Sequence, residues 1–261
     1  MTILQDYPEA IAQDFVRQHI RYVEAFISPA RFLPHGLRIQ PLLAAIRRGL
    51  ARVPAVEVAL VPDLVRDLGP AQAAVTLQAI HEVRELGIIG VGMGGAEPAF
   101  PPELFVEVFA QARRLGLRTT AHAGEAAGPA SIWGALRALQ VDRIGHGTRA
   151  EEDPALLDYL AEQAIPLEVC PLSNVSTRVV PTIADHPVRR YADRGLLVTI
   201  NTDDPRMFGN TLADEFRALH QHFHFTRDEI RRLILQGIQA SWLPRARQEA
   251  FLAAFQQDPA W

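Results

Sequence analysis

Apolar residues recur along the chain with two different periods. Seven short apolar runs, rich in β-branched residues, are typical of buried strands. They occupy residues 20–29, 53–62, 87–95, 117–125, 142–150, 165–174 and 196–205. Between them, apolar residues return every three to four positions, as on one face of a helix. Strands that alternate with helices predict an α/β fold with a parallel sheet. A spacing of about 30 residues per unit suits either a (β/α) barrel or a doubly wound sheet.

Several of the helical stretches carry their own boundary signals. Residues 101–116 begin with proline and end with glycine, which favour the start and the end of a helix. Residues 153–165 and 226–243 show the same apolar spacing, and the latter stretch opens with a capping box. We therefore expect helices over these stretches, and another over residues 6–19, ahead of the first strand.

The number of strands indicates an incomplete barrel. A closed (β/α)8 barrel of the TIM type has eight strands, and we count seven. The helical stretch 6–19 leads directly into the first of them, which is where a preceding strand would be missing. No linker or low-complexity segment interrupts the pattern. We therefore expect residues 1–261 to form a single barrel domain that is truncated at its N-terminus.

Composition and charge argue against several classes of partner. A net charge of −4 and a pI near 6.1 give no reason to expect nucleic acid or a membrane surface as a partner. The single cysteine, Cys170, excludes an internal disulfide; we interpret it as a buried small residue and not a nucleophile. The N-terminus has neither the positive charge nor the apolar stretch of a signal peptide. We expect a cytoplasmic protein.

Polar residues gather at the ends of three predicted strands. The polar residues are His122 and Glu125, His146, and the adjacent pair Asp203 and Asp204; one further strand ends in Gly94 and Gly95. In a parallel barrel the carboxyl ends of the strands share one mouth, where function is concentrated. Two neighbouring carboxylates are tolerable there if a cation neutralises at least one of them.

Four motifs at these strand ends resemble one known family. "TTAHAGE", "RIGHGTRA", "CPLSN" and "VTINTDDP" occur in this order. Together they resemble the adenosine deaminase family of metal-dependent amidohydrolases, from about residue 20 to the C-terminus. The resemblance implies a zinc ion with His122 and Asp203 as ligands, and a small-molecule purine as substrate. Zinc lowers the pKa of bound water to roughly 7, so hydroxide is available at neutral pH.

The resemblance also implies roles for four further residues. Glu125 matches the acid that protonates the purine ring nitrogen next to the attacked carbon. His146 matches the histidine that orients the attacking hydroxide, and Asp204 the carboxylate that hydrogen-bonds to it. Gly95 matches the glycine whose backbone N–H meets the purine. The expected reaction is hydrolytic deamination of a 6-aminopurine to the 6-oxo purine with release of ammonia.

One element of the family pattern is missing from this sequence. The family places two more zinc ligands in a His-x-His on the first barrel strand, and the chain shows no match. The nearest substitute is "HQHFH", with His220, His222 and His224, which we reject because it lies in a stretch predicted to be helical. An alternative function is therefore a truncated, metal-poor purine-binding protein with little or no activity. A barrel that lacks a strand is also expected to expose its edges and favour self-association.

Several candidate residues have ordinary structural explanations as well. His122 alone fits a core histidine bonded to a backbone carbonyl, His146 between two glycines fits a tight turn, and Asp203 fits a helix N-cap. Ser173 and Asn174 follow a strand end, and either line the mouth or form a turn. The substrate also stays open, because adenosine, 2′-deoxyadenosine, adenine and aminofutalosines all carry the same six-membered ring.

Overall fold

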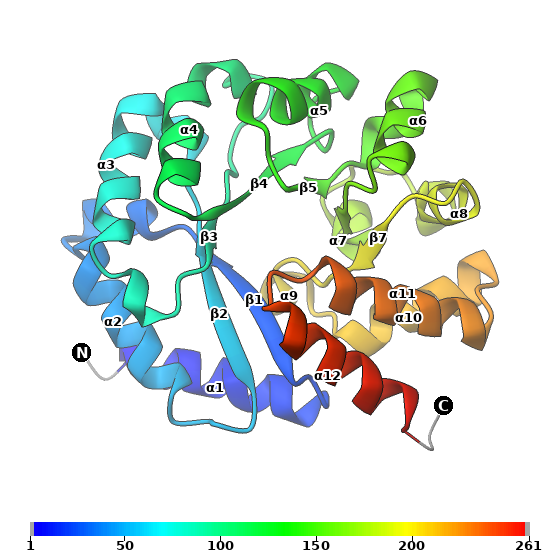
Figure 1. Ribbon diagram of the computed structural model, residues 1–261, viewed down its shortest axis with the longest axis horizontal. Coiled ribbons are helices and arrows are strands. Elements are labelled where there is room, and N and C mark those ends of the chain that lie inside the picture. The colour runs from blue at the N-terminus through cyan, green and yellow to red at the C-terminus, as the bar shows by residue number, and fades with distance from the viewer. Residues whose placement is uncertain (1–2, 259–261) are drawn as a thin grey trace. The chain divides into compact units, whose positions relative to one another are not determined.

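The computed structural model describes residues 3–258 of the chain (Figure 1). The chain divides into two compact units. Unit 1 comprises Met1–His122 and Gly134–Val141, and unit 2 comprises Ala123–Trp133 and Asp142–Trp261. The single barrel domain expected from the sequence stays a prediction.

Unit 1 alternates strands with helices. Its strands are β1 (Tyr22–Ile27), β2 (Glu57–Pro62), β3 (Gly90–Val91) and β4 (Arg118–Ala123), the last residue of which belongs to unit 2. Its longer helices are α1 (Ile3–Arg17), α2 (Ile39–Leu50), α3 (Gly69–His81) and α4 (Val106–Arg114). Short helical turns are η1 (Pro29–His35), η2 (Arg66–Leu68), η3 (Arg84–Leu86), η4 (Pro102–Phe105) and the π-helical η5 (Ala135–Leu139).

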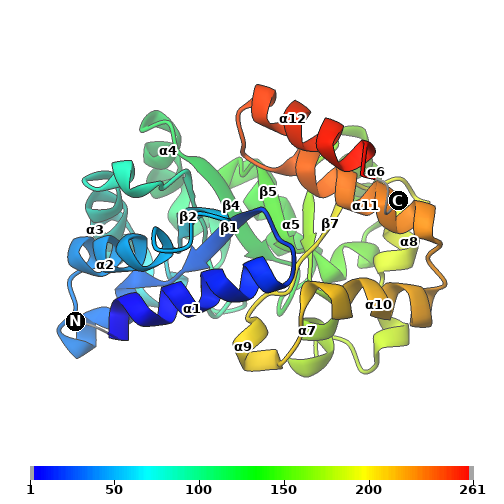
Figure 2. The same cartoon turned by 90° about the horizontal axis from the view of Figure 1, so that it is seen from below.

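The strands of unit 1 are parallel. β1 pairs with β2 over its whole length, and β3 pairs with β4. Two isolated parallel bridges, Leu60 to Ile88 and Asp63 to Gly92, join β2 to the segment around β3. Helices α2, α3 and α4 cover one side of these strands (Figure 1), and α1 packs against α2 (Figure 2). Because each strand returns in the same direction, the carboxyl ends of β2, β3 and β4 lie along one edge.

Unit 2 continues the alternation. Its strands are β5 (Arg143–His146), β6 (Leu167–Val169) and β7 (Val198–Ile200). Its helices are α5 (Pro129–Gly134, with the last residue in unit 1), α6 (Pro154–Glu162), α7 (Pro171–Ser176), α8 (Val188–Asp193), α9 (Pro205–Phe208), α10 (Leu212–Phe223), α11 (Arg227–Ala240) and α12 (Arg245–Gln256). Two short turns, η6 (Thr148–Glu152) and η7 (Ile183–Asp185), precede α6 and α8.

The three strands of unit 2 are also parallel, in the order β5, β6, β7. All four residues of β5 and all three of β7 are buried, as expected for parallel strands covered by helices. Helix α11 packs on β7, and α12 lies beside α11 (Figure 2). The carboxyl ends of these strands therefore lead into loops at one edge, where His146 and the two aspartates lie.

Each of the seven apolar runs contains a strand, and the expected helices are also present. Every run is longer than the strand it contains, and the third, sixth and seventh runs exceed their strands by the most. The third run yields a strand of two residues only, after which Gly92–Gly95 form a loop. The sixth run stops at Val169, and α7 starts at Pro171, because proline lacks an N–H and has a φ suited to the first helical position. Ser173 and Asn174 therefore lie on a helix and not at a strand end.

The helical interpretation of "HQHFH" is confirmed. His220 and His222 belong to the last turn of α10, and His224 follows as its C-cap with φ +55°. His220 uses its Nδ1 to contact the carbonyl oxygen of Phe225 at 2.9 Å. Within residues 3–258, no helix combines the length and apolar character that crossing a bilayer requires.

Candidate active site

Three of the predicted site residues come together in unit 2. His146 ends β5, Glu125 follows β4 by two residues, and Asp203 follows β7 by three. The Nε2 atom of His146 lies 3.6 Å from Oε2 of Glu125 and 3.9 Å from Oδ2 of Asp203. The His146 side chain is only 4% exposed, whereas the two carboxylates keep about a fifth of their surface in solvent. One imidazole nitrogen therefore faces two carboxylates at the edge of the unit.

The backbone at two of these residues is strained. His146 has φ +61° and Asp203 has φ +54°, the left-handed region that side chains other than glycine rarely adopt. Such conformations cost of the order of 1–3 kcal/mol and persist where the surrounding structure enforces them. The simple-turn explanation of His146 does not account for a histidine here, since glycine would fit the same turn without strain.

Helix α7 holds Asp203 in place. The buried hydroxyl of Ser173 donates a hydrogen bond of 2.5 Å to Oδ2 of Asp203. The neighbouring Asp204 occupies the N-cap position of α9, and its carbonyl oxygen accepts from the backbone N–H groups of Met207 and Phe208. The paired aspartates thus have different surroundings: Asp203 is bonded inward, and Asp204 begins an exposed turn.

Asn174, the next residue on α7, contacts His146. Its amide nitrogen Nδ2 lies 3.0 Å from Nδ1 of His146, and both side chains are buried. Its amide oxygen lies 3.1 Å from Nε2 of His186 and accepts from Thr148 at 2.9 Å. The sequence is compatible with Ser173 and Asn174 either lining the mouth or forming a turn. In the structure they orient two of the predicted site residues.

Unit 2 offers side chains that suit a metal ion. One ligand atom from each of His146, Cys170 and Asp203 lies within 4.8 Å of the other two. Carboxylate and imidazole are ordinary zinc ligands. Cys170 is a weaker candidate, because burial and nearby carboxylates raise the pKa of its thiol, which contacts the carbonyl oxygen of Glu168 at 3.6 Å. The residues present fit a zinc ion held by Asp203.

His122 and Gly95 lie in unit 1: His122 is the next-to-last residue of β4, and Gly95 is in the loop that follows β3. The backbone N–H of His122 donates to the carbonyl oxygen of Met93 at 2.9 Å, and its ring lies edge-on to Phe26 at 6.2 Å between centroids. Gly95 has φ +113°, and a Cβ atom there would lie 2.4 Å from a carboxylate oxygen of Asp67. Only glycine fits this position, because any side chain would collide with Asp67.

Two further residues of unit 1, which are not among the predicted site residues, support this edge. Arg66 is fully buried; its guanidinium donates to the carbonyl oxygens of His122 at 2.6 Å and Phe100 at 3.1 Å, and burial lowers its pKa. Asp63 directly follows β2, close beneath the glycine loop after β3. Asp63 had a usable signal, a polar residue after an apolar run. Arg66 of unit 1 and His186 of unit 2 had no such signal, since neither lies at the end of a predicted strand.

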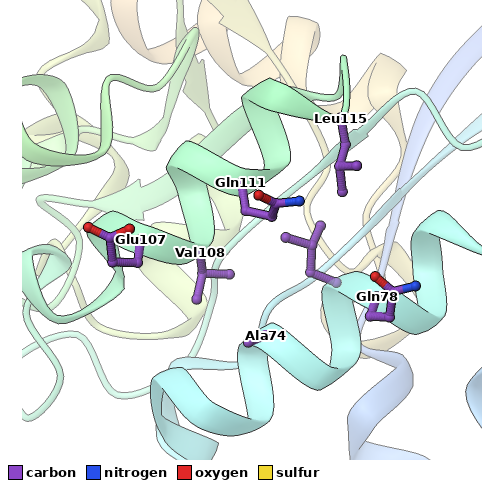
Figure 3. A pocket seen from close by; sticks show the side chains of 7 residues that line it. Ala74, Gln78, Glu107, Val108, Gln111 and Leu115 are labelled. Atoms are coloured by element: carbon purple, nitrogen blue, oxygen red, sulfur yellow. The ribbon is translucent and has the colours of Figure 1, made fainter.

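A pocket of about 140 Å³ lies elsewhere in unit 1, between α3 and α4 (Figure 3). It is lined by Ala74, Leu77, Gln78, Glu107, Val108, Gln111 and Leu115. The lining comes from helices and the residue after α4, not from strand ends, and contains none of the predicted site residues.

Comparison with known proteins decides the family. The sequence profile described as adenosine deaminase matches residues 6–257. The chain belongs to the adenosine deaminase family. An adenine deaminase from Bordetella parapertussis is 39% identical over 226 residues, covering 85% of this chain and 71% of the relative. An adenosine deaminase from Klebsiella pneumoniae is 38% identical over 245 residues, covering 92% and 73%.

Solved structures agree with this assignment. An adenine deaminase from Arthrobacter aurescens matches with a TM-score of 0.93 and 31% identity, over 97% of this chain and 78% of that one. An amidohydrolase from Burkhoderia ambifaria, solved with bound Zn, matches with a TM-score of 0.91 and 29% identity, over 97% and 72%. The expected fold class, α/β with the parallel strands of a TIM-type barrel, is confirmed. The chain is an enzyme of the aminohydrolase kind.

Proposed function

We propose that this family member catalyses the zinc-dependent hydrolytic deamination of adenine, adenosine or a related 6-aminopurine to the 6-oxo purine. The observation that carries the proposal is the approach of Glu125 and Asp203 to Nε2 of His146, at 3.6 and 3.9 Å. An acid, a metal-binding carboxylate and a proton-bearing imidazole within one small region are what addition of water to an aromatic amine needs.

Glu125 is proposed as the acid. Attack at the amino-bearing carbon disrupts the aromatic ring, and the ring nitrogen beside it becomes basic enough to take a proton. The carboxyl of Glu125 is mostly shielded from solvent and lies next to His146, so it is held where it can deliver that proton. The proton that Asp204 takes from water can then pass to the departing ammonia, and the carboxylate of Glu125 can recover a proton from the hydroxyl that becomes the 6-oxo group.

Asp203 and His122 are the proposed zinc ligands. Zinc, when bound, lowers the pKa of water and supplies hydroxide at neutral pH. The hydrogen bond from Ser173 fixes the rotamer of Asp203, which is how outer partners of ligating carboxylates act. Asp204 is proposed to accept a proton of the attacking water, and His146 to orient it through Nε2. The backbone N–H of Gly95 is proposed to bind the purine.

Our first prediction tests this function through Glu125. Glu125→Gln keeps the size of the side chain but removes the transferable proton, so deamination should fall at least about 10²-fold while zinc and purine binding persist. Deamination is measured by the absorbance change from 6-amino to 6-oxo purine, with adenine, adenosine, 2′-deoxyadenosine and an aminofutalosine as substrates.

The matched control is Glu152→Gln, which changes an exposed glutamate that pairs with Arg149 in η6. This variant should match the parent enzyme. An active Glu125→Gln enzyme would remove Glu125 from its role. A parent chain that binds purines but holds no zinc and deaminates none of the four substrates would instead support the metal-poor alternative.

The cytoplasmic location and the self-association expected from the sequence stay predictions.

A further inference from the structure

We propose that Asn174 and His186 are positioning residues that fix the tautomer of His146, so that Nε2 of His146 carries a proton and Nδ1 does not. The inference rests on the proposed function, in which His146 acts through Nε2. It assigns roles to two residues that do not face the candidate carboxylates, and it follows from a chain of hydrogen bonds that begins at a backbone N–H.

The first link in this chain is unambiguous. The backbone N–H of Val188, at the start of α8, donates to Nδ1 of His186 at 3.1 Å. A backbone N–H is always a donor, so Nδ1 of His186 must be the acceptor nitrogen. A neutral imidazole carries its proton on the other nitrogen, which places a hydrogen on Nε2. His186 is 1% exposed, and burial lowers its pKa to about 3, so the ring is neutral near neutral pH.

The second link orients the amide of Asn174. Nε2 of His186 lies 3.1 Å from Oδ1 of Asn174, and the hydroxyl of Thr148 approaches the same oxygen at 2.9 Å. If the amide were turned over, its NH2 group would face the N–H of His186, and two donors would meet in a buried site. The oxygen of Asn174 therefore points toward His186, and its NH2 group points toward His146.

The third link sets the tautomer of His146. Nδ2 of Asn174 lies 3.0 Å from Nδ1 of His146, so this nitrogen accepts a hydrogen bond and carries no proton. The proton of the neutral ring is then on Nε2, the atom that faces Glu125 and Asp203. The oxygens of Glu125 and Asp203 lie beyond hydrogen-bond distance from Nε2, so the tautomer is set by the contact with Asn174.

The assignment has a chemical consequence for the site. A nitrogen that bears a proton cannot also give its lone pair to zinc, so His146 is a hydrogen-bond donor to the attacking water and not a metal ligand. The close grouping of His146, Cys170 and Asp203 is then not a complete ligand set. Orienting partners of this kind are a recurrent way to set which nitrogen of a histidine is used.

The experiment observes the proton directly. The chain is labelled with ¹⁵N at its histidine rings, and NMR correlation of ring nitrogens with ring carbon-bound hydrogens reports which nitrogen of His146 is protonated, with and without added zinc. The signals are assigned by their loss in His146→Gln. We expect the proton on Nε2 in the parent protein. A proton on Nδ1 would overturn the proposal, and this result needs no folded variant of Asn174 or His186.

A nearly isosteric variant tests the cause. Asn174→Asp replaces the NH2 donor by a second acceptor oxygen, so His146 should shift its proton to Nδ1, and kcat should fall about 10²-fold with a much smaller change in KM. Ser176→Ala, which removes an exposed hydroxyl of the same helix bonded to Leu172, should leave both properties unchanged. An unshifted tautomer in a folded Asn174→Asp protein would contradict the inference.

The two proposals fail in different ways. A parent protein with the proton on Nε2 but no activity toward any 6-aminopurine would contradict the proposed function and leave the tautomer assignment intact. An active parent enzyme with the proton on Nδ1 of His146 would contradict the tautomer assignment and leave the proposed function intact.

Discussion

Asp203 and Asp204 are adjacent in the chain, yet the structure gives them different partners. Asp203 accepts from the buried hydroxyl of Ser173, whereas Asp204 begins the exposed turn α9. A carboxylate fixed by a second residue is suited to hold a metal ion, and a carboxylate at the exposed start of a helix is suited to exchange protons with water. The two positions should therefore respond differently to the same change.

Replacing each aspartate with alanine separates these roles. Asp203→Ala should lose zinc and, with it, activity. Asp204→Ala should retain zinc but lose turnover, because one hydrogen-bond acceptor for the attacking water is gone. Zinc is measured by elemental analysis after dialysis, and turnover by the purine absorbance change. Asp193→Ala, a change at an exposed partner of Arg189 on α8, serves as the control. Equal zinc loss from both site variants would refute the division of roles.

Individual residues differ in how far the sequence predicts them. Glu125, His146 and Asp203 were found because strand ends are visible as breaks in an apolar pattern, and parallel strands bring those ends to one edge. His186 was not found, because it acts through Asn174 from a loop before α8, and only the folded chain makes that contact. Arg66 was missed for a similar reason, since it reaches His122 through a backbone carbonyl.

At the scale of elements, α7 does more than connect β6 to the next helix. Two successive residues on it orient side chains from two different strand ends: Ser173 bonds to Asp203, and Asn174 bonds to His146. The sequence predicted a longer strand here, because the apolar run continues past Val169 without a break. Only Pro171 marked the start of the helix, and proline is compatible with several local structures.

Helix α10 stabilises the start of α7 through a buried carboxyl group. Glu215 is fully buried. Its carboxylate accepts hydrogen bonds from the backbone N–H of Leu172 at 3.2 Å and from the side-chain amide of Asn210 at 2.7 Å. Asn210 also donates to the carbonyl oxygen of Thr202, next to Asp203. Burial raises the pKa of Glu215 to about 7, and hydrogen bonds from Leu172 and Asn210 oppose part of that rise.

This raised pKa predicts a pH dependence of stability. Since the folded pKa exceeds the unfolded value of 4.5, the stability it contributes is complete below about pH 4.5 and is lost as the pH rises through about 7. The loss should be on the order of 3 kcal/mol in the free energy of unfolding. Glu215→Gln removes the titrating group, so its free energy of unfolding should fall less over the same range.

Urea unfolding at a series of pH values measures the effect as a difference in slope between the variant and the parent. Glu162→Gln, at an exposed position that ends α6, should keep the parent slope. Parallel slopes for the Glu215→Gln variant and the parent would show that Glu215 does not titrate in this range.

At the scale of the whole molecule, the chain passes between its two units three times, after His122, Trp133 and Val141. The first passage lies inside β4, and residues 134–141 return to unit 1. Because neither unit is one continuous segment, we expect them to unfold together. The two tryptophans among residues 3–258, Trp133 and Trp242, belong to unit 2, so their fluorescence reports on that unit.

Denaturant unfolding followed by fluorescence and by far-ultraviolet circular dichroism should therefore give coincident transitions, as a single cooperative domain requires. A circular dichroism transition that is displaced from the fluorescence transition would show that the units unfold separately. Circular dichroism responds to the helices of both units, so the parent protein provides both signals and needs no variant.

The left-handed backbone at His146 and Asp203 also bears on how this enzyme can be engineered. Glycine at either position would relieve backbone strain, but it would also remove the hydrogen-bond partner of the buried Asn174 or Ser173. The same replacement would remove an imidazole or a carboxylate from the proposed chemistry. Libraries built for thermal tolerance should therefore hold these two codons constant and draw their gains from the helices and surface loops.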